Sequence, residues 1–373
     1  MSDTVALLQR LVGIDSTSIR SNLPLLEVLE EAARPLGFSA RRQAWRDAAG
    51  QEKANLILRR GPERAGGLAL VGHTDCVPFD AAWEGALQGE VQGGKLFGRG
   101  SADTKAFLAA ALGAAARVRH HDGPLWLIFT ADEEVGCLGA KQLVLEGLVR
   151  PAHAIVGEPT RLIPVRAHKG YCLAEVEVRG QEAHSAYPAL GASAILGAGQ
   201  LLRAIEEAQA ELAADTDAQF EPPWTSFNVG VIEGGKAKNV VAGHCRFTLE
   251  WRPIPGQDVR RALALVERAC ARVSAESGSR LTATVRASRM DPGVSVRADA
   301  PLIRFLEKQT GNRAETIPFG TELPQLAQLG AEACVFGPGD IRVAHKAGEF
   351  VPLDELAKAE TILAAAIDHF CRI

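Results

Sequence analysis

Short runs of apolar residues between polar stretches are the feature that most constrains the fold of this chain. The runs at residues 68–71, 125–130 and 154–156 are continuous rather than alternating, as is typical of strands buried on both faces. Stretches with high helix propensity separate them, at residues 105–120 and 138–148. This alternation of strands and helices predicts an α/β domain.

The pattern changes near residue 165, where a second domain is expected. Six elements follow, in the order strand, helix, strand, strand, helix, strand, at residues 171–178, 191–208, 226–232, 245–252, 258–274 and 281–287. This order is the split βαβ pattern of a small, ferredoxin-like α+β domain with two layers.

After about residue 288 the α/β pattern returns, with a strand at residues 333–336 and a helix at residues 354–370. A length of 373 residues also favours about two domains. We therefore predict one domain formed by residues 1–166 and 288–373, with a second domain, residues 167–287, inserted into it.

Composition excludes several classes of function. The 41 Lys and Arg residues and the 45 Asp and Glu residues give a net charge of -4 without a long block of one sign, so we expect no binding to nucleic acid or to an anionic membrane. No apolar run reaches the roughly 18 residues that cross a bilayer, and the N-terminal residues lack the pattern of a secretion signal. Seven scattered cysteines without a C-x-x-C pair indicate reduced thiols, and we expect a cytoplasmic protein.

Histidine and acidic residues follow the predicted strands, and they are the first indication of chemistry. His73 and Asp75 lie two residues apart after the run at 68–71, so an extended backbone directs both side chains the same way. His73 is a candidate metal ligand, with Asp75 orienting its second ring nitrogen. A solvated strand end is the alternative.

Further acidic residues occupy a turn and another strand end. Asp103 lies in a glycine-rich turn and either binds a metal or caps the helix that follows, through the free N–H groups of its first turn. Glu133 and Glu134 follow the run at 125–130, with Asp132 before them. Because adjacent carboxylates repel one another, they indicate a bound cation or a catalytic task, unless they form a solvated acidic turn.

Glu158 and His345 also follow predicted strands, at residues 154–156 and 333–336. The strand-end residues favour a single site, because ligands bind open α/β sheets at the carboxyl ends of the strands. Imidazole and carboxylate groups suit borderline divalent ions such as zinc and cobalt. With one further glutamate they predict a two-metal hydrolase, whose candidate ligands are His73, Asp103, Glu134, Glu158 and His345.

Six ordered motifs resemble one known family. They are HTD at 73–75, GRGSADTKA at 98–106, TADEEVGCLGA at 130–140, VGEPT at 156–160, GQEAHSAYP at 180–188 and AHKAGE at 344–349. They are similar to the zinc metallopeptidase family of acetylornithine deacetylase, succinyl-diaminopimelate desuccinylase, aminoacylase and glutamate carboxypeptidase, over essentially the whole chain. The resemblance implies a zinc-peptidase-like α/β catalytic domain with an inserted dimerisation, or lid, domain.

The resemblance also implies a role for each residue of the site. Glu133 is the general base, which receives a proton from water and passes it to the leaving amine, and Asp75 supports His73. Two divalent ions per chain, zinc or cobalt, are expected. By resemblance the first is held by His73 and Glu158, the second by Glu134 and His345, and the bridge between them is Asp103.

Three residues of the inserted domain receive roles from the same resemblance. His184 is similar to a lid histidine that the family contributes from the partner subunit to stabilise the oxyanion, and a polar residue at a turn is the alternative. Asn239 and Arg252 match the positions from which family lids hold the substrate carboxylate, with a solvated arginine as the alternative. We therefore expect a homodimer formed through this domain.

Finer features, such as WRPIPG at 251–256, resemble acetylornithine deacetylase more closely than the desuccinylase. They imply hydrolysis of N-acetyl-L-ornithine to L-ornithine and acetate, in arginine biosynthesis. Glu322 either faces the δ-ammonium of that substrate or is an acid at a helix N-terminus ahead of Pro324. Acetylcitrulline, other acyl-amino acids and succinyl-diaminopimelate stay open as alternative substrates.

Two functions of other classes are also considered. A zinc carboxypeptidase that cuts peptides requires a cleft for a longer chain, which a sequence does not reveal. A metal-binding protein without catalysis has no need of a base such as Glu133 beside its ligands.

Overall fold

The computed structural model describes residues 3–372, and the chain divides into two compact units. Unit 1 contains the described residues up to Arg166, Val296–Glu315 and the described residues from Thr321 on. Unit 2 contains Ala167–Ser295 and Thr316–Gly320.

Residue 288, the expected point of return to the first domain, lies inside strand β12 (Thr282–Asp291). This strand pairs with β9 (Tyr171–Arg179) as far as Asp291, and unit 2 therefore extends to Ser295. Two short strands contain a boundary between the units, namely β8 (Val165–His168) and β14 (Glu315–Ile317), and β13 (Val294–Ser295) ends at a third boundary.

Unit 1 is built on a sheet whose strands follow the order β1, β2, β6, β3, β7, β15. The four strands from β6 to β15 run parallel, whereas β1 and β2 are antiparallel to their neighbours. Every residue of β3 and β6 is buried, which confirms the prediction from the continuous apolar runs. The bounds are β1 (Ser39–Arg46), β2 (Glu52–Arg60), β3 (Leu68–His73), β6 (Leu125–Thr130), β7 (His153–Val156) and β15 (Glu332–Val335).

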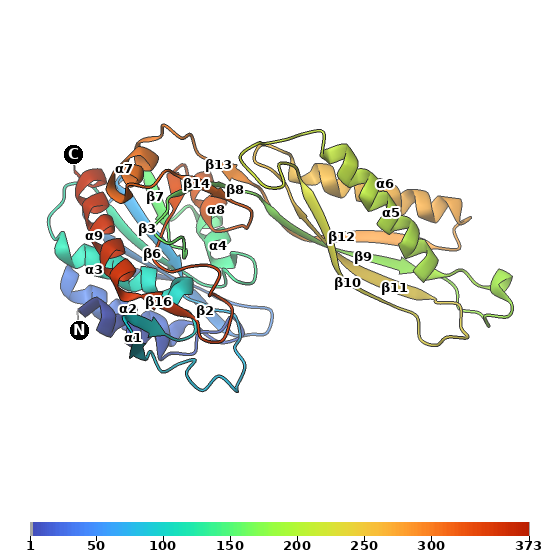
Figure 1. Ribbon diagram of the computed structural model, residues 1–373, viewed down its shortest axis with the longest axis horizontal. Helices are drawn as coiled ribbons and strands as arrows, with labels where there is room; N and C mark the ends of the chain where they lie inside the picture. The colour runs from blue at the N-terminus through green and yellow to red at the C-terminus, as the bar shows by residue number, and fades with distance from the viewer. Residues whose placement is uncertain (1–2, 373) are drawn as a thin grey trace. The chain divides into compact units, whose positions relative to one another are not determined.

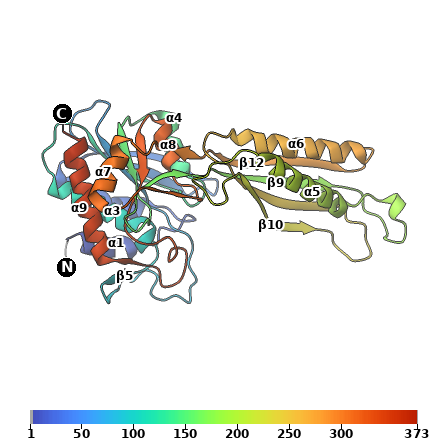
Figure 2. The same cartoon turned by 45° about the horizontal axis from the view of Figure 1, so that its top comes forward.

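The predicted alanine-rich helix is α3 (Ala106–Arg117), which packs against α9 (Leu353–Phe370), as Figures 1 and 2 both show. Its small side chains allow α3 to lie close to the sheet. Phe107 of this helix packs against Gly157, which follows β7, and a Cβ atom at Gly157 would lie only 2.2 Å from the Phe107 ring. The other helical elements of unit 1 are α1 (Asp3–Val12), α2 (Leu23–Ala33), η1 (Arg34–Leu36), α4 (Leu138–Glu146), α7 (Pro301–Thr310) and α8 (Leu323–Gln328).

A small antiparallel sheet in unit 1 joins two segments that are distant in sequence. Its order is β16 (Phe350–Pro352), β5 (Lys95–Phe97) and β4 (Val91–Gln92). The irregular turn η2 (Ser101–Lys105) follows β5 closely. The pairing of β16 with β5 therefore brings the residues just before β16 to the residues just after β5.

Unit 2 is a four-stranded antiparallel sheet in the order β10, β11, β9, β12, with α5 and α6 on one face (Figures 1 and 2). Alternate residues of β9 are buried against the helices, beginning with Cys172 and Ala174. The predicted strand–helix–strand–strand–helix–strand order is confirmed. The remaining bounds are η3 (Pro188–Leu190), α5 (Ala194–Leu212), β10 (Ser226–Gly234), β11 (His244–Arg252) and α6 (Val259–Glu276).

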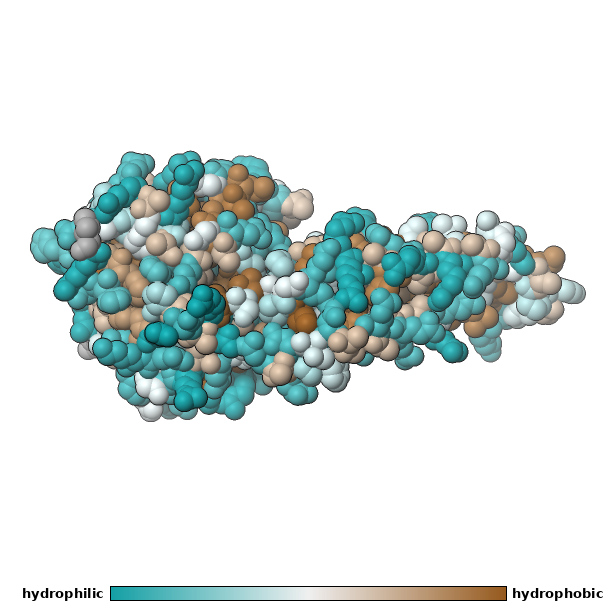
Figure 3. All heavy atoms as spheres, turned by 90° about the horizontal axis from the view of Figure 1, so that it is seen from above, coloured by the Kyte–Doolittle hydropathy of each residue, from teal (hydrophilic) through white to brown (hydrophobic). Residues whose placement is uncertain are grey.

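Hydrophilic side chains cover most of the face drawn in Figure 3, with smaller hydrophobic areas between them. Among the described residues, no helix has both the length and the apolar character needed to cross a bilayer.

Candidate active site

The candidate residues of unit 1 gather at the carboxyl ends of its parallel strands. His73 is the last residue of β3, and Glu133 and Glu134 follow β6. Glu158 lies just beyond β7, and His345 lies in the loop after β15. This is the edge at which open α/β sheets bind their ligands.

Asp103 lies between two imidazole rings. Its Oδ1 is 3.0 Å from Nε2 of His73, and its Oδ2 is 3.1 Å from Nε2 of His345. The same nitrogen of His345 is 3.1 Å from Oε1 of Glu134. Asp103 does not cap α3, because no side chain caps that helix and both oxygens of this carboxylate face histidines.

Three of these residues meet the distance requirement for a shared metal ion. One ligand atom from each of His73, Asp103 and Glu134 lies within 4.8 Å of the others. Glu158 is outside that group, although it is buried and the charge of Asp103 acts on it. A donor set of imidazole and carboxylate without thiolate fits borderline divalent ions.

The electrostatics of the cluster also call for a cation. Burial raises the pKa of Glu133 to about 8, and it raises the pKa of Glu158 well above its usual value. Hydrogen bonds to Asp103 and Glu134 raise the pKa of His345 to about 10. The bare cluster therefore retains protons, because neighbouring buried carboxylates cannot all be charged without a cation among them.

Asp75 contacts the segment that carries Glu133 and Glu134 as well as His73. His73 Nδ1 is 2.9 Å from the backbone oxygen of Asp75 and 3.6 Å from its Oδ1, so the carbonyl is the nearer partner. The carboxylate accepts the backbone N–H of Glu133 at 3.0 Å and that of Glu134 at 3.2 Å, and the Ser18 hydroxyl at 2.8 Å. Asp75 therefore fixes the segment that carries both glutamates.

Asp132, the first of the three adjacent acids, is paired with a buried lysine. Lys53 Nζ donates to Asp132 Oδ1 at 2.6 Å and to the Ser18 carbonyl oxygen at 2.6 Å. The charge of Asp132 is therefore balanced within the fold by Lys53.

Glu133, the next residue, accepts a hydrogen bond from a cysteine. The thiol of Cys137 donates to Oε1 of Glu133 at 3.4 Å.

Glu349 holds the backbone of the turn that contains Asp103. Its Oε1 accepts the N–H groups of Ala102 at 3.0 Å and Asp103 at 3.1 Å, and its Oε2 accepts Nη1 of Arg99 at 2.5 Å. Both Arg99 and Glu349 are buried. Glu349 is the last residue of the AHKAGE motif, but its role could not be predicted, because a carboxylate that binds backbone N–H groups leaves no pattern of side-chain types.

Glu322 lies directly before α8, as one interpretation of the sequence expected, but its side chain caps nothing. The Thr321 hydroxyl instead accepts the N–H of Leu323 at 3.1 Å. Glu322 is 1% exposed, and neither of its carboxylate oxygens has a hydrogen-bond partner. Its charge raises the pKa of Glu133, so it lies within electrostatic range of the cluster.

His184, Asn239 and Arg252 all belong to unit 2. His184 and Asn239 are exposed neighbours, because the N–H of Ser185 donates to the Asn239 carbonyl oxygen at 3.0 Å. Arg252 is the last residue of β11, where its guanidinium lies 4.1 Å from the centre of the Tyr171 ring and its Nε donates to Glu250 at 2.8 Å. Arg252 is therefore held in place rather than fully solvated.

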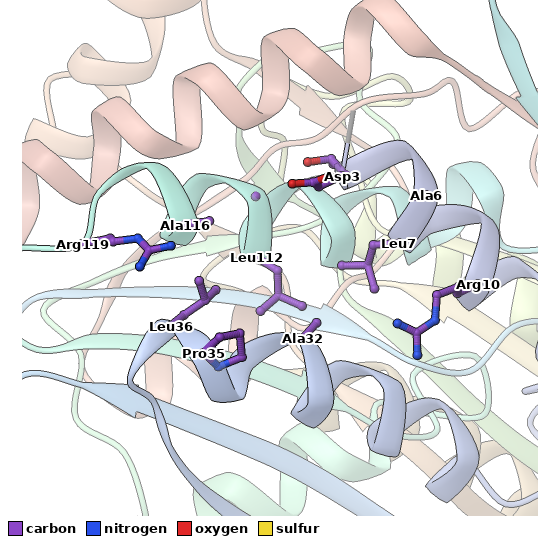
Figure 4. Close-up of a pocket in the computed structure, with 12 residues that line it drawn as sticks. Asp3, Ala6, Leu7, Arg10, Ala32, Pro35, Leu36, Leu112, Ala116 and Arg119 are labelled. Atoms are coloured by element: carbon purple, nitrogen blue, oxygen red, sulfur yellow. The ribbon is translucent and has the colours of Figure 1, made fainter. Parts of the chain in front are cut away.

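A separate pocket of about 410 Å³ lies between α1, η1 and α3 (Figure 4). Apolar side chains such as Leu7, Leu36 and Leu112 line it, with Arg10 and Arg119 at either end. It shares no lining residue with the cluster around Asp103. This pocket is therefore not part of the candidate active site.

Comparison with known proteins adds four findings. The model of the family described as Peptidase family M20/M25/M40 matches residues 69–369. A Myxococcus xanthus protein named acetylornithine deacetylase is 54% identical, over 100% of this chain and 99% of that protein. A protein of the same name from Edwardsiella ictaluri (strain 93-146) is 33% identical, over 99% and 98% of the two chains. The crystal structure of an M20 family metallo-carboxypeptidase from Sulfolobus solfataricus has the same fold, with a TM-score of 0.79 at 17% identity over 98% of this chain and 99% of that chain.

The raised pKa values predict how the metal-free protein responds to pH. Burial raises the pKa of Glu133 from 4.5 to about 8, so the stability from its proton is complete below pH 4.5 and is lost as the pH rises to about 8. The raised pKa values of Glu158 and His345 act in the same direction. In thermal denaturation, chelator-treated protein should therefore melt at a lower temperature at about pH 8 than at about pH 5. Added zinc should remove much of this fall, and a melting temperature that rises with pH in the metal-free protein would contradict the prediction.

Glu349→Gln should weaken metal binding by about 10- to 100-fold. The substitution replaces one of the two carboxylate oxygens that accept hydrogen bonds from Arg99, Ala102 and Asp103, and these bonds fix the turn that contains Asp103. Isothermal titration of chelated protein with zinc or cobalt measures the change. Glu332→Gln is the matched control, because Glu332 also accepts a backbone N–H, from Leu302 at 2.7 Å, but lies at the amino end of β15. Equal losses of affinity in the two variants would show that Glu349 has no special connection to the site.

Proposed function

This chain belongs to peptidase family M20/M25/M40, and on that basis we propose that it hydrolyses N-acetyl-L-ornithine to L-ornithine and acetate. The observation that carries the proposal is the 54% identity, over the whole chain, to a protein named acetylornithine deacetylase. The cluster around Asp103 supports the same class of chemistry, metal-dependent hydrolysis of an amide.

In this proposal the site binds two divalent ions, zinc or cobalt. His73 and Glu158 would hold one ion, and Glu134 and His345 would hold the other. Asp103 would serve both, which is supported by its two oxygens each lying about one hydrogen-bond length from a different imidazole, at 3.0 and 3.1 Å. When bound, the ions supply Lewis-acid polarisation of the scissile carbonyl group.

Glu133 performs the proton transfers. Its carboxylate receives a proton from the attacking water and delivers it to the amine nitrogen as the C–N bond breaks, which leaves acetate and a free amine. A buried environment that raises the pKa of Glu133 to about 8 suits a group that must both accept and release a proton. Asp75 keeps this base in position through the N–H of Glu133.

Residues of unit 2 bind the rest of the substrate in this proposal. Arg252 and Asn239 hold the α-carboxylate, and the planar guanidinium of Arg252 can do so with two parallel hydrogen bonds. The contact of Arg252 with the Tyr171 ring supports this role, because it keeps the guanidinium in one orientation. His184 donates a hydrogen bond to the oxygen that gains negative charge during the attack.

The protein is proposed to form a homodimer through unit 2, so that His184 acts on the site of the partner subunit. The free edge strand β10 supports this, with Val231 57% and Ile232 50% exposed. Leu196 of α5 is also 72% exposed. Cytoplasmic location and a role in arginine biosynthesis belong to the same proposal, and the burial of all seven cysteine thiols suits a reducing compartment.

Purified protein supplied with zinc or cobalt should show its highest kcat/KM on N-acetyl-L-ornithine, in a comparison with acetylcitrulline, acetylmethionine and succinyl-diaminopimelate. Chelation should abolish activity, and up to two divalent ions per chain should restore it. A higher value for acetylcitrulline or the succinylated compound would reassign the substrate. Cleavage of peptides alone would favour a carboxypeptidase, and activity in the metal-free enzyme would exclude the mechanism.

Glu133→Gln should lower kcat by about two to four orders of magnitude while metal content stays near that of the wild type, because a base but no ligand is lost. Glu134→Gln is the matched neighbour and should lower metal content as well. Steady-state kinetics and metal analysis of both variants provide the measurement. Metal loss confined to the Glu133 variant would mean that the two roles are exchanged.

Mixing inactive Glu133→Gln chains with inactive His184→Ala chains should restore activity. A heterodimer contains one site in which the base and the partner's histidine are both intact, so about half of the wild-type activity per heterodimer is expected. Size-exclusion chromatography first establishes that heterodimers form. An absence of recovery in verified heterodimers would mean that His184 acts within its own chain or has no role.

A further inference from the structure

Glu322 is a buried carboxylate whose charge the fold compensates only in part. It is 1% exposed, and neither of its oxygens has a hydrogen-bond partner by distance and angle. Burial raises its pKa to about 7 and outweighs the electrostatic interactions with His73 and with the Thr130 hydroxyl, which lower the pKa. The Thr321 hydroxyl accepts the N–H of Leu323, and the Glu322 side chain does not cap α8.

A second acceptor lies one helical turn further along α8. The Oε1 atom of Gln325 is also buried without a partner, and residues at positions i and i+3 share one face of a helix. The backbone N–H of Gln325 donates to the Glu322 carbonyl oxygen at 3.1 Å, which joins the two residues within this turn. Both residues therefore carry buried acceptor oxygens for which the fold shows no hydrogen-bond donor by distance and angle.

Retaining such a group has a physical cost, because a buried carboxylate without a cation or donor is strongly destabilising. Glu349 in the same unit demonstrates the contrast, since its carboxylate accepts three hydrogen bonds from the fold. A ligand that carries positive charge and N–H donors would be complementary to the Glu322 carboxylate.

The place of Glu322 indicates which ligand meets it. The charges of Asp75 and His73 act on Glu322, and the charge of Glu322 acts on the general base Glu133. A ligand that reaches Glu322 is therefore a molecule bound at the reacting centre. An N-acyl amino acid with an ammonium group on its side chain has the required charge.

We infer that Glu322, together with Gln325, binds the side-chain ammonium of the substrate and so selects basic over neutral N-acyl amino acids. This inference rests on the proposed hydrolysis of N-acetyl-L-ornithine. Burial raises the pKa of Glu322 to about 7, and an ammonium group beside it favours the ionised form. The carboxylate thus gains its cation only when the substrate is bound.

The test compares three substrates that share one side-chain carbon skeleton on the wild type and on Glu322→Gln. N-acetyl-L-ornithine carries the ammonium, N-acetyl-L-citrulline carries a larger neutral ureido group in its place, and N-acetyl-L-norvaline has the same carbon chain without a polar end. We expect kcat/KM for acetylornithine to fall by roughly 10- to 100-fold in the variant, the scale of one charged hydrogen bond. The values for the two neutral substrates should stay the same or rise.

Product binding gives a second readout that does not require turnover. L-Ornithine should raise the melting temperature of the wild type more than L-norvaline does, and Glu322→Gln should abolish the difference. The metal-free variant should also melt at a higher temperature than the wild type, because an unsatisfied buried charge has been removed. Glu332→Gln is the control, because Glu332 lies at the amino end of β15 and the candidate site lies at the carboxyl end. This variant should behave as the wild type in every assay.

The results of these assays distinguish a failure of the inference about Glu322 from a failure of the proposed function. An equal loss of kcat/KM on all three substrates would overturn the inference, because Glu322 would then act on the common chemistry, while the proposed function would stand. Activity that depends on sodium or potassium ions in the wild type, but not in the variant, would also overturn it by assigning Glu322 to an inorganic cation. A wild type that hydrolyses none of the three would instead overturn the proposed function.

Discussion

Asp103 shares its two carboxylate oxygens between His73 and His345, and the rest of the site depends on this contact. Its contact with His345 joins residues that are 242 positions apart. His73 ends β3 and His345 follows β15, and both strands belong to the parallel part of the sheet. Glu133, Glu134 and Glu158 crowd the same edge, and burial raises the pKa of each of them. Such a concentration of buried acid is stable only with protons or metal ions among the carboxylates, so the fold and the chemistry share one electrostatic requirement.

Much of this arrangement could be predicted from the sequence, because residue type and strand position are local properties. Continuous apolar runs identified β3, β6 and β7, and the acids and histidines that follow them indicated the candidate site. The supporting contacts could not be predicted. Asp75 binds the N–H groups of Glu133 and Glu134, and Lys53 pairs with Asp132, and both contacts depend on loops that meet only in three dimensions. The extension of unit 2 to Ser295 escaped prediction for the same reason, since β12 pairs with the distant strand β9. The hairpin of β1 and β2 was also not predicted, although its two strands are close in sequence.

Two buried glutamates in unit 1 illustrate how a structural acid differs from one that awaits a ligand. Glu349 accepts hydrogen bonds from two backbone N–H groups and from Arg99, so folding itself satisfies its charge. Glu322 accepts none, although it is equally buried. Counting donors around a buried carboxylate therefore separates the two kinds, whereas burial alone does not.

The division of unit 1 into separate stretches of sequence has a consequence for synthesis on the ribosome. A nascent chain that has emerged as far as Ser295 contains all four strands of the β10–β11–β9–β12 sheet, but it lacks β15, α9 and His345. Until β15 and α9 are synthesised, one edge of β7 has no partner strand, and the face of α3 that packs against α9 is not covered. Exposed strand edges and apolar helix faces of this kind are where partly made proteins associate with one another or with chaperones. The inserted unit thus lengthens the interval during which this strand edge and helix face lack their partners.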